Sequence, residues 1–219
     1  MITSISGTIL YLFSVLVFRT CRFRVSGIEQ LESALEKGKP IIVTSWHGMT
    51  MMIAGYLRKK IDASSIMGIR PDDHRGDTLE VFGRKLGVDS IRLDLSGDST
   101  LGSGRKLVSL VRKMSAGKNL IIHPDGPAGP AYFVKPGVTY LAKKTGAAIL
   151  PFGCYCRHAY HVPRWDRYTL PLPFSKVHIQ IGNILTVPKN IQDLSETNQQ
   201  LTDILHRVSA QASANYYEH

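Results

Sequence analysis

Short apolar runs alternate with amphipathic stretches over much of the chain, and this alternation constrains the fold more than any other feature of the sequence. Strands are expected at residues 22–25, 41–45, 65–69, 90–93, 120–123, 148–152 and 177–181. Helices are expected at residues 28–37, 48–60, 77–86, 104–116, 137–145 and 193–214. Strands that alternate with helices need crossover connections, which produce a mainly parallel sheet covered by helices. The 219 residues therefore predict a single α/β domain with a less regular C-terminal third.

The N-terminal segment predicts a helix that associates with a membrane. Residues 1–18 carry no charged side chain, and Arg19, Arg22 and Arg24 follow at once. A cleavable signal would carry its basic residues before the apolar run, so this segment is expected to be retained. The expected organisation is a membrane-associated helix at residues 1–20 and a catalytic body at residues 21–219, on the cytoplasmic face of the cell membrane.

Hydropathy does not decide how this helix meets the membrane. About 17 residues is the short limit for crossing the hydrocarbon core, so a spanning helix and one lying in the interface both remain open. A helix buried in the protein core is a further alternative.

The charge balance of 27 basic and 17 acidic residues, a formal net charge of +10, favours anionic partners. An anionic membrane surface is expected, whereas nucleic acid is not, because no nucleic-acid-binding motif is present. The three cysteines are expected to be reduced thiols in a cytosolic setting. The spacing of Cys154, Cys156, His158 and His161 is unlike that of structural zinc sites, and no metal is expected.

Two of the expected strands end on polar side chains. The strand at residues 41–45 runs into Trp46-His47-Gly48, and the strand at residues 120–123 runs into Pro124-Asp125-Gly126. In an open α/β sheet, ligands bind beyond the carboxyl ends of the strands, so His47 and Asp125 share one site if their strands are neighbours. An imidazole is well suited to remove a proton from an alcohol. A hydrogen-bonded core histidine and a turn-capping aspartate are the structural alternatives.

Two further loops carry groups that suit an anion. The first follows the expected strand at residues 65–69 and contains Arg70, His74, Arg75 and Asp77. Guanidinium groups match phosphate oxygens, although a solvated loop explains the same pattern. The second is the glycine- and hydroxyl-rich loop at residues 95–104, which opens a helix beginning with Arg105. Backbone amides at a helix start bind anions, so this loop is a weaker candidate for the same role.

Seven segments together carry a family resemblance. They are residues 46–48 (Trp-His-Gly), 74–77 (His-Arg-Gly-Asp), 97–104, 124–130 (Pro-Asp-Gly-Pro-Ala-Gly-Pro), 136–138 (Pro-Gly-Val), 149–151 (Ile-Leu-Pro) and 165–174 (Trp-Asp-Arg-Tyr-Thr-Leu-Pro-Leu-Pro-Phe). In this order and spacing, the chain from about residue 20 to residue 190 resembles the lysophospholipid acyltransferase superfamily. The resemblance is to the bacterial branch long catalogued as a domain of unknown function, some of whose members are implicated in adding secondary acyl chains to lipid A precursors.

The resemblance implies a glycerol-3-phosphate acyltransferase-like fold and a cofactor-free O-acyl transfer. The acyl chain would pass from a thioester on acyl carrier protein or coenzyme A to a hydroxyl of a lipid, either a lysophospholipid or a lipid A precursor. His47 would act as the general base, and Asp125 would orient it or bind substrate, with Asp77 the second choice as the orienting carboxylate. The expected substrate-binding residues are Arg70, His74, Arg75, Asp77, Gly126 and Arg105.

The chain departs from the family pattern in three places. The branch's His-x-Asp-Gly-Glu pattern appears here as His-Arg-Gly-Asp-Thr-Leu-Glu at residues 74–80. The superfamily places an aspartate five residues after its histidine, where this chain has Met52. The branch usually has an arginine inside the Pro-Asp-Gly-Pro loop, where this chain has Ala128. These departures leave a non-catalytic, lipid-binding relative of the same fold as the alternative.

Overall fold

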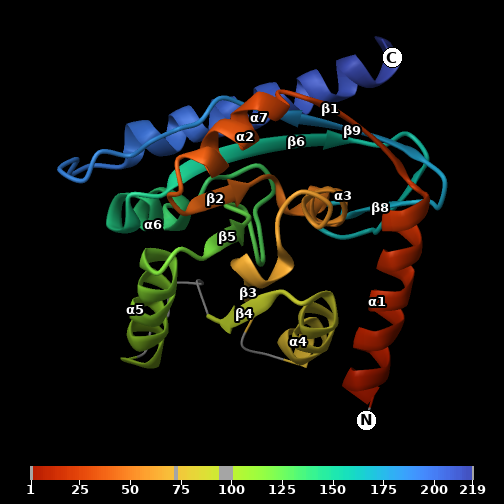
Figure 1. Ribbon diagram of the computed structural model, residues 1–219, viewed down its shortest axis with the longest axis horizontal. Helices are drawn as coiled ribbons and strands as arrows, with labels where there is room; N and C mark the ends of the chain where they lie inside the picture. Colours follow the sequence, from red (N-terminus) through yellow and green to blue (C-terminus); the bar gives the residue numbers. More distant parts are fainter. Residues whose placement is uncertain (1, 72–73, 94–100, 219) are drawn as a thin grey trace.

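The computed structural model describes residues 2–71, 74–93 and 101–218 (Figure 1), and the side chains of residues 2, 74 and 101–103 lie outside this description. The α-helices are α1 (Ile2–Thr20), α2 (Ile28–Glu36), α3 (Thr50–Leu57), α4 (His74–Leu86), α5 (Leu101–Ser115), α6 (Gly137–Thr145) and α7 (Ser195–Glu218). The strands are β1 (Arg22–Ser26), β2 (Ile41–Thr44), β3 (Ile66–Arg70), β4 (Asp89–Arg92), β5 (Asn119–Ile122), β6 (Ala148–Tyr155), β7 (Ala159–His161), β8 (Thr169–Pro171) and β9 (Lys176–Ile181). Short 3-10 helices cover His47–Met49 and Ala63–Ser65.

Seven strands form one sheet in the order β1-β9-β6-β2-β5-β3-β4. Neighbouring strands are parallel except for the antiparallel pair β6 and β9. All four residues of β2 are buried, which is the pattern of a central strand covered on both faces. The expected fold class, one α/β domain with a mainly parallel sheet, is confirmed.

Helices cover both faces of this sheet. One buried cluster includes apolar side chains of α1, α2 and α3, and a second includes side chains of α5, α6 and α7. The long α7 packs along β6 and β9 (Figure 1). Because helices hold the sheet from both sides, the carboxyl ends of the central strands are fixed relative to each other.

The structure contains a hairpin of β7 and β8, apart from the main sheet, that the sequence did not predict. Each of its strands has three residues, which is too short to produce a readable alternation. The hairpin lies within the stretch that was expected to be irregular. The loop that joins β7 to β8 contains Trp165 and Asp166.

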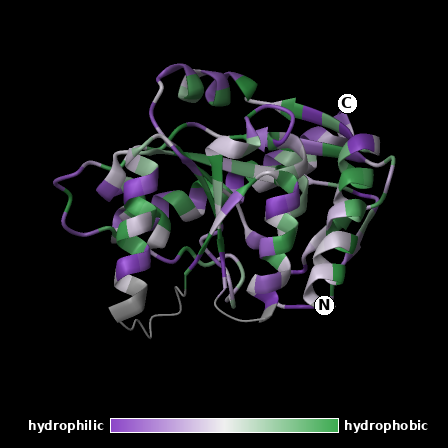
Figure 2. Cartoon of the chain, turned by 60° about the horizontal axis from the view of Figure 1, so that its bottom comes forward, coloured by the Kyte–Doolittle hydropathy of each residue, from purple (hydrophilic) through white to green (hydrophobic). Residues whose placement is uncertain are grey.

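Helix α1 packs along the body of the protein on one face only. A Cβ atom at Gly7 would lie 2.7 Å from Cβ of Val81, so this glycine lets α1 approach α4 closely. Residues Thr3–Thr20 are long and apolar enough to cross a membrane, and 22% of this window is buried. Most of α1 is white or green in the hydropathy colouring of Figure 2.

Candidate active site

The carboxyl ends of β2 and β5 bring His47 and Asp125 together. The two strands are parallel neighbours, with Thr44 paired to Ile122, so their adjacency is confirmed. The Asp125 carboxylate accepts hydrogen bonds from the backbone N–H groups of His47 at 2.9 Å and Tyr132 at 3.3 Å. Burial raises the pKa of Asp125, although these backbone hydrogen bonds oppose the shift. Asp125 therefore ties the two loops together at the edge of the sheet.

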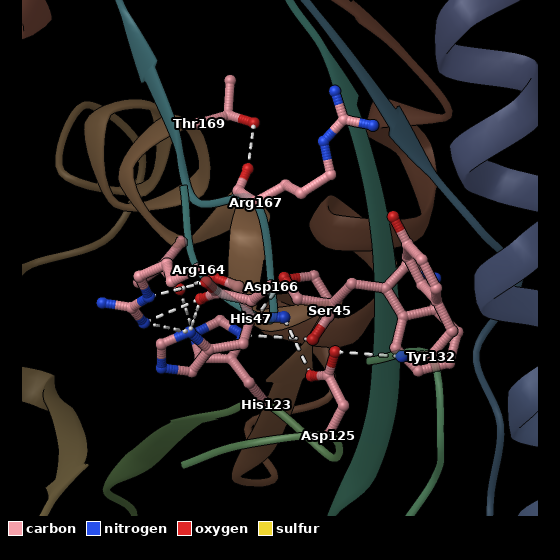
Figure 3. A network of polar contacts seen from close by, with 11 residues as sticks. Ser45, His47, His123, Asp125, Tyr132, Arg164, Asp166, Arg167 and Thr169 are labelled. Carbon is pink, nitrogen blue, oxygen red and sulfur yellow. Dashed lines mark hydrogen bonds and ion pairs between the residues drawn. The ribbon is translucent and has the colours of Figure 1, made fainter. Parts of the chain in front are cut away.

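The His47 ring is held by a different carboxylate. Its Nδ1 lies 2.6 Å from Oδ2 of Asp166, which is buried behind it (Figure 3). Arg164 donates to both oxygens of Asp166, from Nε at 2.6 Å and from Nη2 at 2.8 Å. Burial alone would raise the pKa of Asp166, but the hydrogen bonds from Arg164 and His47 outweigh it and leave the pKa lowered. Asp166 is thus poised to stay ionised beside the imidazole.

This arrangement differs from the sequence-based expectation that Asp125, or else Asp77, orients the ring. Asp125 contacts the backbone of His47, whereas Asp166 contacts its Nδ1. The position five residues after His47 is buried Met52, which is part of the apolar core. Asp166 lies 119 residues further along the chain, and no local pattern linked it to His47. The one available signal was its place in the segment at residues 165–174, which carried part of the family resemblance.

Two glycines make room for this network. A Cβ atom at Gly48 would lie 2.3 Å from the carbonyl oxygen of Asp166, so the chain at residue 48 touches the loop that carries the carboxylate. A Cβ atom at Gly126 would lie 2.9 Å from Cδ2 of His47. Gly126, which was expected to bind substrate, therefore lies directly against the imidazole ring.

A second histidine lies behind the first. His123 is hydrogen-bonded to Ser45 and Thr50, and its ring centroid is 5.4 Å from that of His47. Burial, together with the nearby His47, lowers the pKa of His123 to about 3. A histidine with this pKa is neutral at physiological pH, so His123 supports the site through hydrogen bonds rather than through charge.

A cavity of about 250 Å³ opens beside this network. Asp125 and Asp166 line it, together with Trp46 and Met49. Its basic lining residues, among those the structure describes, are His161 and Arg167. The Arg167 side chain extends away from the His47–Asp166 pair (Figure 3), so a molecule in this cavity meets the Asp166 carboxylate and the Arg167 guanidinium at different places.

The other predicted substrate-binding residues lie further along the sheet. Arg70 ends β3 and contacts Glu80 at 2.8 Å and Ser90 at 3.1 Å, while Asp77 forms an ion pair with Arg92. Strand β5 separates β3 from β2, and within the described residues neither Arg70 nor Asp77 contacts His47.

The remaining predicted contacts are only partly described. Arg75 and Arg105 are exposed on α4 and α5. Helix α4 begins at His74, but the side chain of His74 lies outside the description, as do residues 95–100 of the glycine-rich loop. The anion-binding roles of these residues stay predictions.

The described residues contain no group of three or more His, Cys, Asp or Glu side chains that could hold a metal ion. Cys21, Cys154 and Cys156 are free and buried, and burial raises the pKa of each thiol. A buried thiol with a raised pKa is a poor nucleophile. The candidate reactive group of this site is therefore the His47 imidazole with its neighbouring carboxylates, and not a thiol.

Comparison with known proteins agrees with this fold. No family model matches the chain. The chain is 26% identical over 171 residues to the uncharacterized protein RP090 of Rickettsia prowazekii (strain Madrid E). This match covers 76% of this chain and 75% of that protein. Its fold is similar to that of the crystal structure of the 1-acyl-sn-glycerophosphate (LPA) acyltransferase PlsC from Thermotoga maritima, with a TM-score of 0.62 and 20% identity. That match covers 95% of this chain and 80% of PlsC, and at this identity it shows a shared fold.

Proposed function

We propose that this protein is a membrane-associated O-acyltransferase with His47 as its general base. The observation that carries the proposal is the 2.6 Å contact between Nδ1 of His47 and buried Asp166, beside an open cavity. A carboxylate on Nδ1 fixes the ring and stabilises the imidazolium that forms when the other nitrogen takes a proton. The fold shared with the acyltransferase PlsC and the family resemblance of the sequence support the same reaction class.

In the proposed reaction, Nε2 of His47 removes the proton from an acceptor hydroxyl. No described residue hydrogen-bonds to Nε2, and the His47 side chain is 24% exposed, so substrate can reach it. The acceptor oxygen attacks the carbonyl carbon of an acyl thioester, and the C–S bond then breaks. The departing thiolate takes the proton from His47, which returns the imidazole to its neutral form. The products are an ester and a free thiol, and the enzyme forms no covalent intermediate.

The substrates follow from this chemistry and from the resemblance. The donor is a fatty acyl thioester of acyl carrier protein or coenzyme A, and the acceptor is a lipid hydroxyl on a lysophospholipid or lipid A precursor. The 1-acyl-sn-glycerophosphate for which PlsC is named carries a phosphate, which suits the basic residues Arg70, His74, Arg75 and Arg105. The apolar α1 and the net charge of +10 support binding at the cytoplasmic face of the cell membrane.

The first test measures acyl transfer by the purified protein in detergent micelles. Acyl-carrier-protein and coenzyme A thioesters are offered with each class of lipid acceptor, and ester formation is followed by mass spectrometry. We expect transfer by the wild type and a loss of about 10²–10⁴-fold in His47→Ala, the range that a positioned acid–base group contributes. His158→Ala, which changes an exposed histidine outside the lining of this cavity, is the matched control. Equal activity of His47→Ala and wild type would remove His47 from the mechanism.

The same experiment addresses the alternative of a non-catalytic lipid-binding relative. Two departures from the family pattern, at Ala128 and at residues 74–80, favour that alternative. Asp166 argues against it, because an ionised carboxylate already occupies the orienting position beside His47. Lipid binding by the wild type without transfer from either donor would favour the non-catalytic function.

A further inference from the structure

A second cavity, of about 380 Å³, lies away from the catalytic network at the edge of the main sheet. Its cationic lining comes from Arg22 and Arg24 of the edge strand β1 and from Lys176 of β9. Arg22 is paired with Lys176 across the parallel strands, and Arg24 follows two residues later on the same face. Three positive charges therefore border one cavity, and none of its lining residues borders the cavity beside Asp166.

These charges are not neutralised by neighbouring carboxylates. Among the residues that the structure describes, no Asp or Glu forms an ion pair with Arg22, Arg24 or Lys176. Arg22 and Arg24 are exposed, while the ammonium of Lys176 lies 4.1 Å from the ring centroid of Tyr216. The Lys176 ammonium also donates a hydrogen bond to the carbonyl oxygen of Tyr216. A group of cations without a carboxylate partner suits a phosphate.

An exposed apolar loop borders the same cavity. Phe174 lines it, and this residue is 72% exposed and has a φ of 68°. A positive φ is uncommon for an aromatic residue, and the Phe174 N–H donates to Oγ1 of Thr20 at 3.2 Å. Leu172, two residues earlier, is 49% exposed. The loop therefore holds two large apolar side chains in water at the C-terminal end of α1.

The outer face of α1 is apolar as well. Ile5, Ile9, Leu12 and Leu16 are each about half exposed or more, at 53%, 62%, 61% and 48%, and their spacing places them on one face of the helix. The opposite face packs on α4, where Gly7 approaches Val81. Because this inner face is packed against protein, the exposed apolar side chains of α1 form one stripe along the helix and do not surround it.

We propose that the second cavity binds the head group of an anionic phospholipid within a bilayer, and that the protein lies on the membrane through one continuous surface. In this arrangement Arg22, Arg24 and Lys176 contact the lipid phosphate. Phe174 and Leu172 enter the interface beside it, and α1 lies parallel to the bilayer with its apolar stripe facing the acyl chains. The proposal rests on the membrane association proposed above, but it does not depend on the chemistry at His47.

The position of the hairpin gives this surface a link to the reaction. His161 and Thr169 of the hairpin line the cavity beside Asp166, and the chain continues from β8 directly into Leu172 and Phe174. The five residue-to-residue steps from Thr169 to Phe174 span at most about 18 Å. Docking through Phe174 would therefore bring the catalytic cavity within one lipid length of the interface.

The first test is flotation of the full chain with vesicles of phosphatidylcholine, with or without phosphatidylglycerol. We expect binding to the anionic vesicles, and a loss of affinity of about 30-fold in Arg22→Gln/Arg24→Gln, since each basic residue near an anionic surface contributes about fivefold. Arg112→Gln/Lys143→Gln is the matched control, because it removes the same charge from α5 and α6 at the opposite end of the molecule from α1 (Figure 1). Equal affinity of the two double variants would overturn the head-group site.

The second test measures how deeply the proposed docking surface enters the bilayer. The native cysteines are buried, so a fluorophore reacts with a cysteine introduced at Ile5, Leu12, Leu16 or Phe174. Lipids carrying a nitroxide at a shallow or a deep position then report the depth of each label by quenching. An in-plane α1 predicts shallow quenching at all four sites. Deep quenching at Leu12 between shallow sites would show a spanning helix and overturn the in-plane arrangement, whereas no quenching would overturn bilayer docking altogether.

Discussion

The two cavities of this protein differ in how their charged side chains are paired. Beside the catalytic cavity, the carboxylates of Asp125 and Asp166 are buried, and each accepts two or more hydrogen bonds. Around the second cavity, Arg22 and Arg24 are exposed and have no carboxylate partner among the described residues. The carboxylates at the catalytic cavity are therefore held by hydrogen-bond donors, whereas the two arginines at the second cavity have no carboxylate partner among the described residues.

The difference follows from the cost of desolvation. A buried ion is stable only when hydrogen bonds and opposite charges replace its water, and those same partners fix its position. An exposed cation keeps its water and attracts anions over a distance of about a Debye length, without fixing their geometry. The paired region suits a reaction that needs precise placement of a proton acceptor, and the unpaired region suits attachment to a charged surface.

The largest expected effect comes from Asp166→Asn, which keeps the shape of the side chain but removes the charge beside His47. We expect kcat for acyl transfer to fall by about 10²–10⁴-fold. KM should change little, because the lost interaction is with the imidazolium of the transition state. Steady-state kinetics on the micellar substrates measure both constants, and Asp203→Asn, at an exposed position of α7, is the matched control. Kinetics like those of this control would place Asp166 outside the reaction.

A smaller effect is expected on stability when Asp125 is replaced. Asp125→Ala leaves the N–H groups of His47 and Tyr132 without their acceptor, which should cost about 1–3 kcal/mol for each buried group left unpaired. Asp125→Asn keeps one carbonyl oxygen and should lose less. Urea unfolding at neutral pH measures the difference, and a loss no smaller in Asn than in Ala would contradict this role of the carboxylate.

The raised pKa of Asp125 also predicts a sign for the pH dependence. The folded state holds this proton more tightly than the unfolded chain, so its contribution to stability is present below the unfolded pKa. The contribution is lost as the pH rises through the higher folded pKa. Asp125→Asn should lack this decline when its unfolding free energy is compared with that of the wild type across acidic pH.

A rise in salt concentration should affect membrane binding and acyl transfer differently. At about 1 M salt the Debye length is near 3 Å, compared with about 10 Å at 0.1 M, so binding to anionic vesicles should weaken strongly. The kcat measured in neutral detergent should change much less, because buried ion pairs are screened poorly. Flotation and kinetics over the same salt series test the contrast. A parallel decline in both would show that the two regions do not differ in this way.

The smallest expected effect is that of Arg164→Gln. Arg164 is partly exposed, and its hydrogen bonds help to hold the pKa of Asp166 below its usual value. Without them the pKa of Asp166 rises, so the carboxylate becomes protonated at a higher pH. Activity at neutral pH should fall little, while the acidic limb of the kcat profile should move to higher pH. An unchanged limb would show that Arg164 does not control this ionisation.

The sequence predicted most of the fold because the fold depends on local patterns. The apolar run at β2 and its counterpart at β5 were recognisable as strands, and parallel strand ends meet at one edge of a sheet. That reasoning placed His47 and Asp125 in one site. The hairpin of β7 and β8 was missed because three-residue strands have no readable period.

The carboxylate beside the His47 ring differs from the one that the sequence favoured, for a related reason. Asp125 was the aspartate nearest to His47 by strand-end reasoning, and it does contact the backbone of His47. Asp166 follows no strand of the main sheet, and it reaches the ring because Gly48 allows its loop to approach the chain beside His47. A contact between such distant residues leaves no trace in the spacing of a single sequence.

The sequence by itself determined the α/β class, the apolar N-terminal helix, the basic charge and the strand ends that carry His47 and Asp125. Each of these follows from periodicity or composition within a short window of chain. Tertiary structure alone decided that Asp166 holds the imidazole, that α1 packs on one face, and that Arg22, Arg24 and Lys176 border one cavity. These features depend on which loops and strand edges the packed core brings together, and such packing is a property of the whole chain.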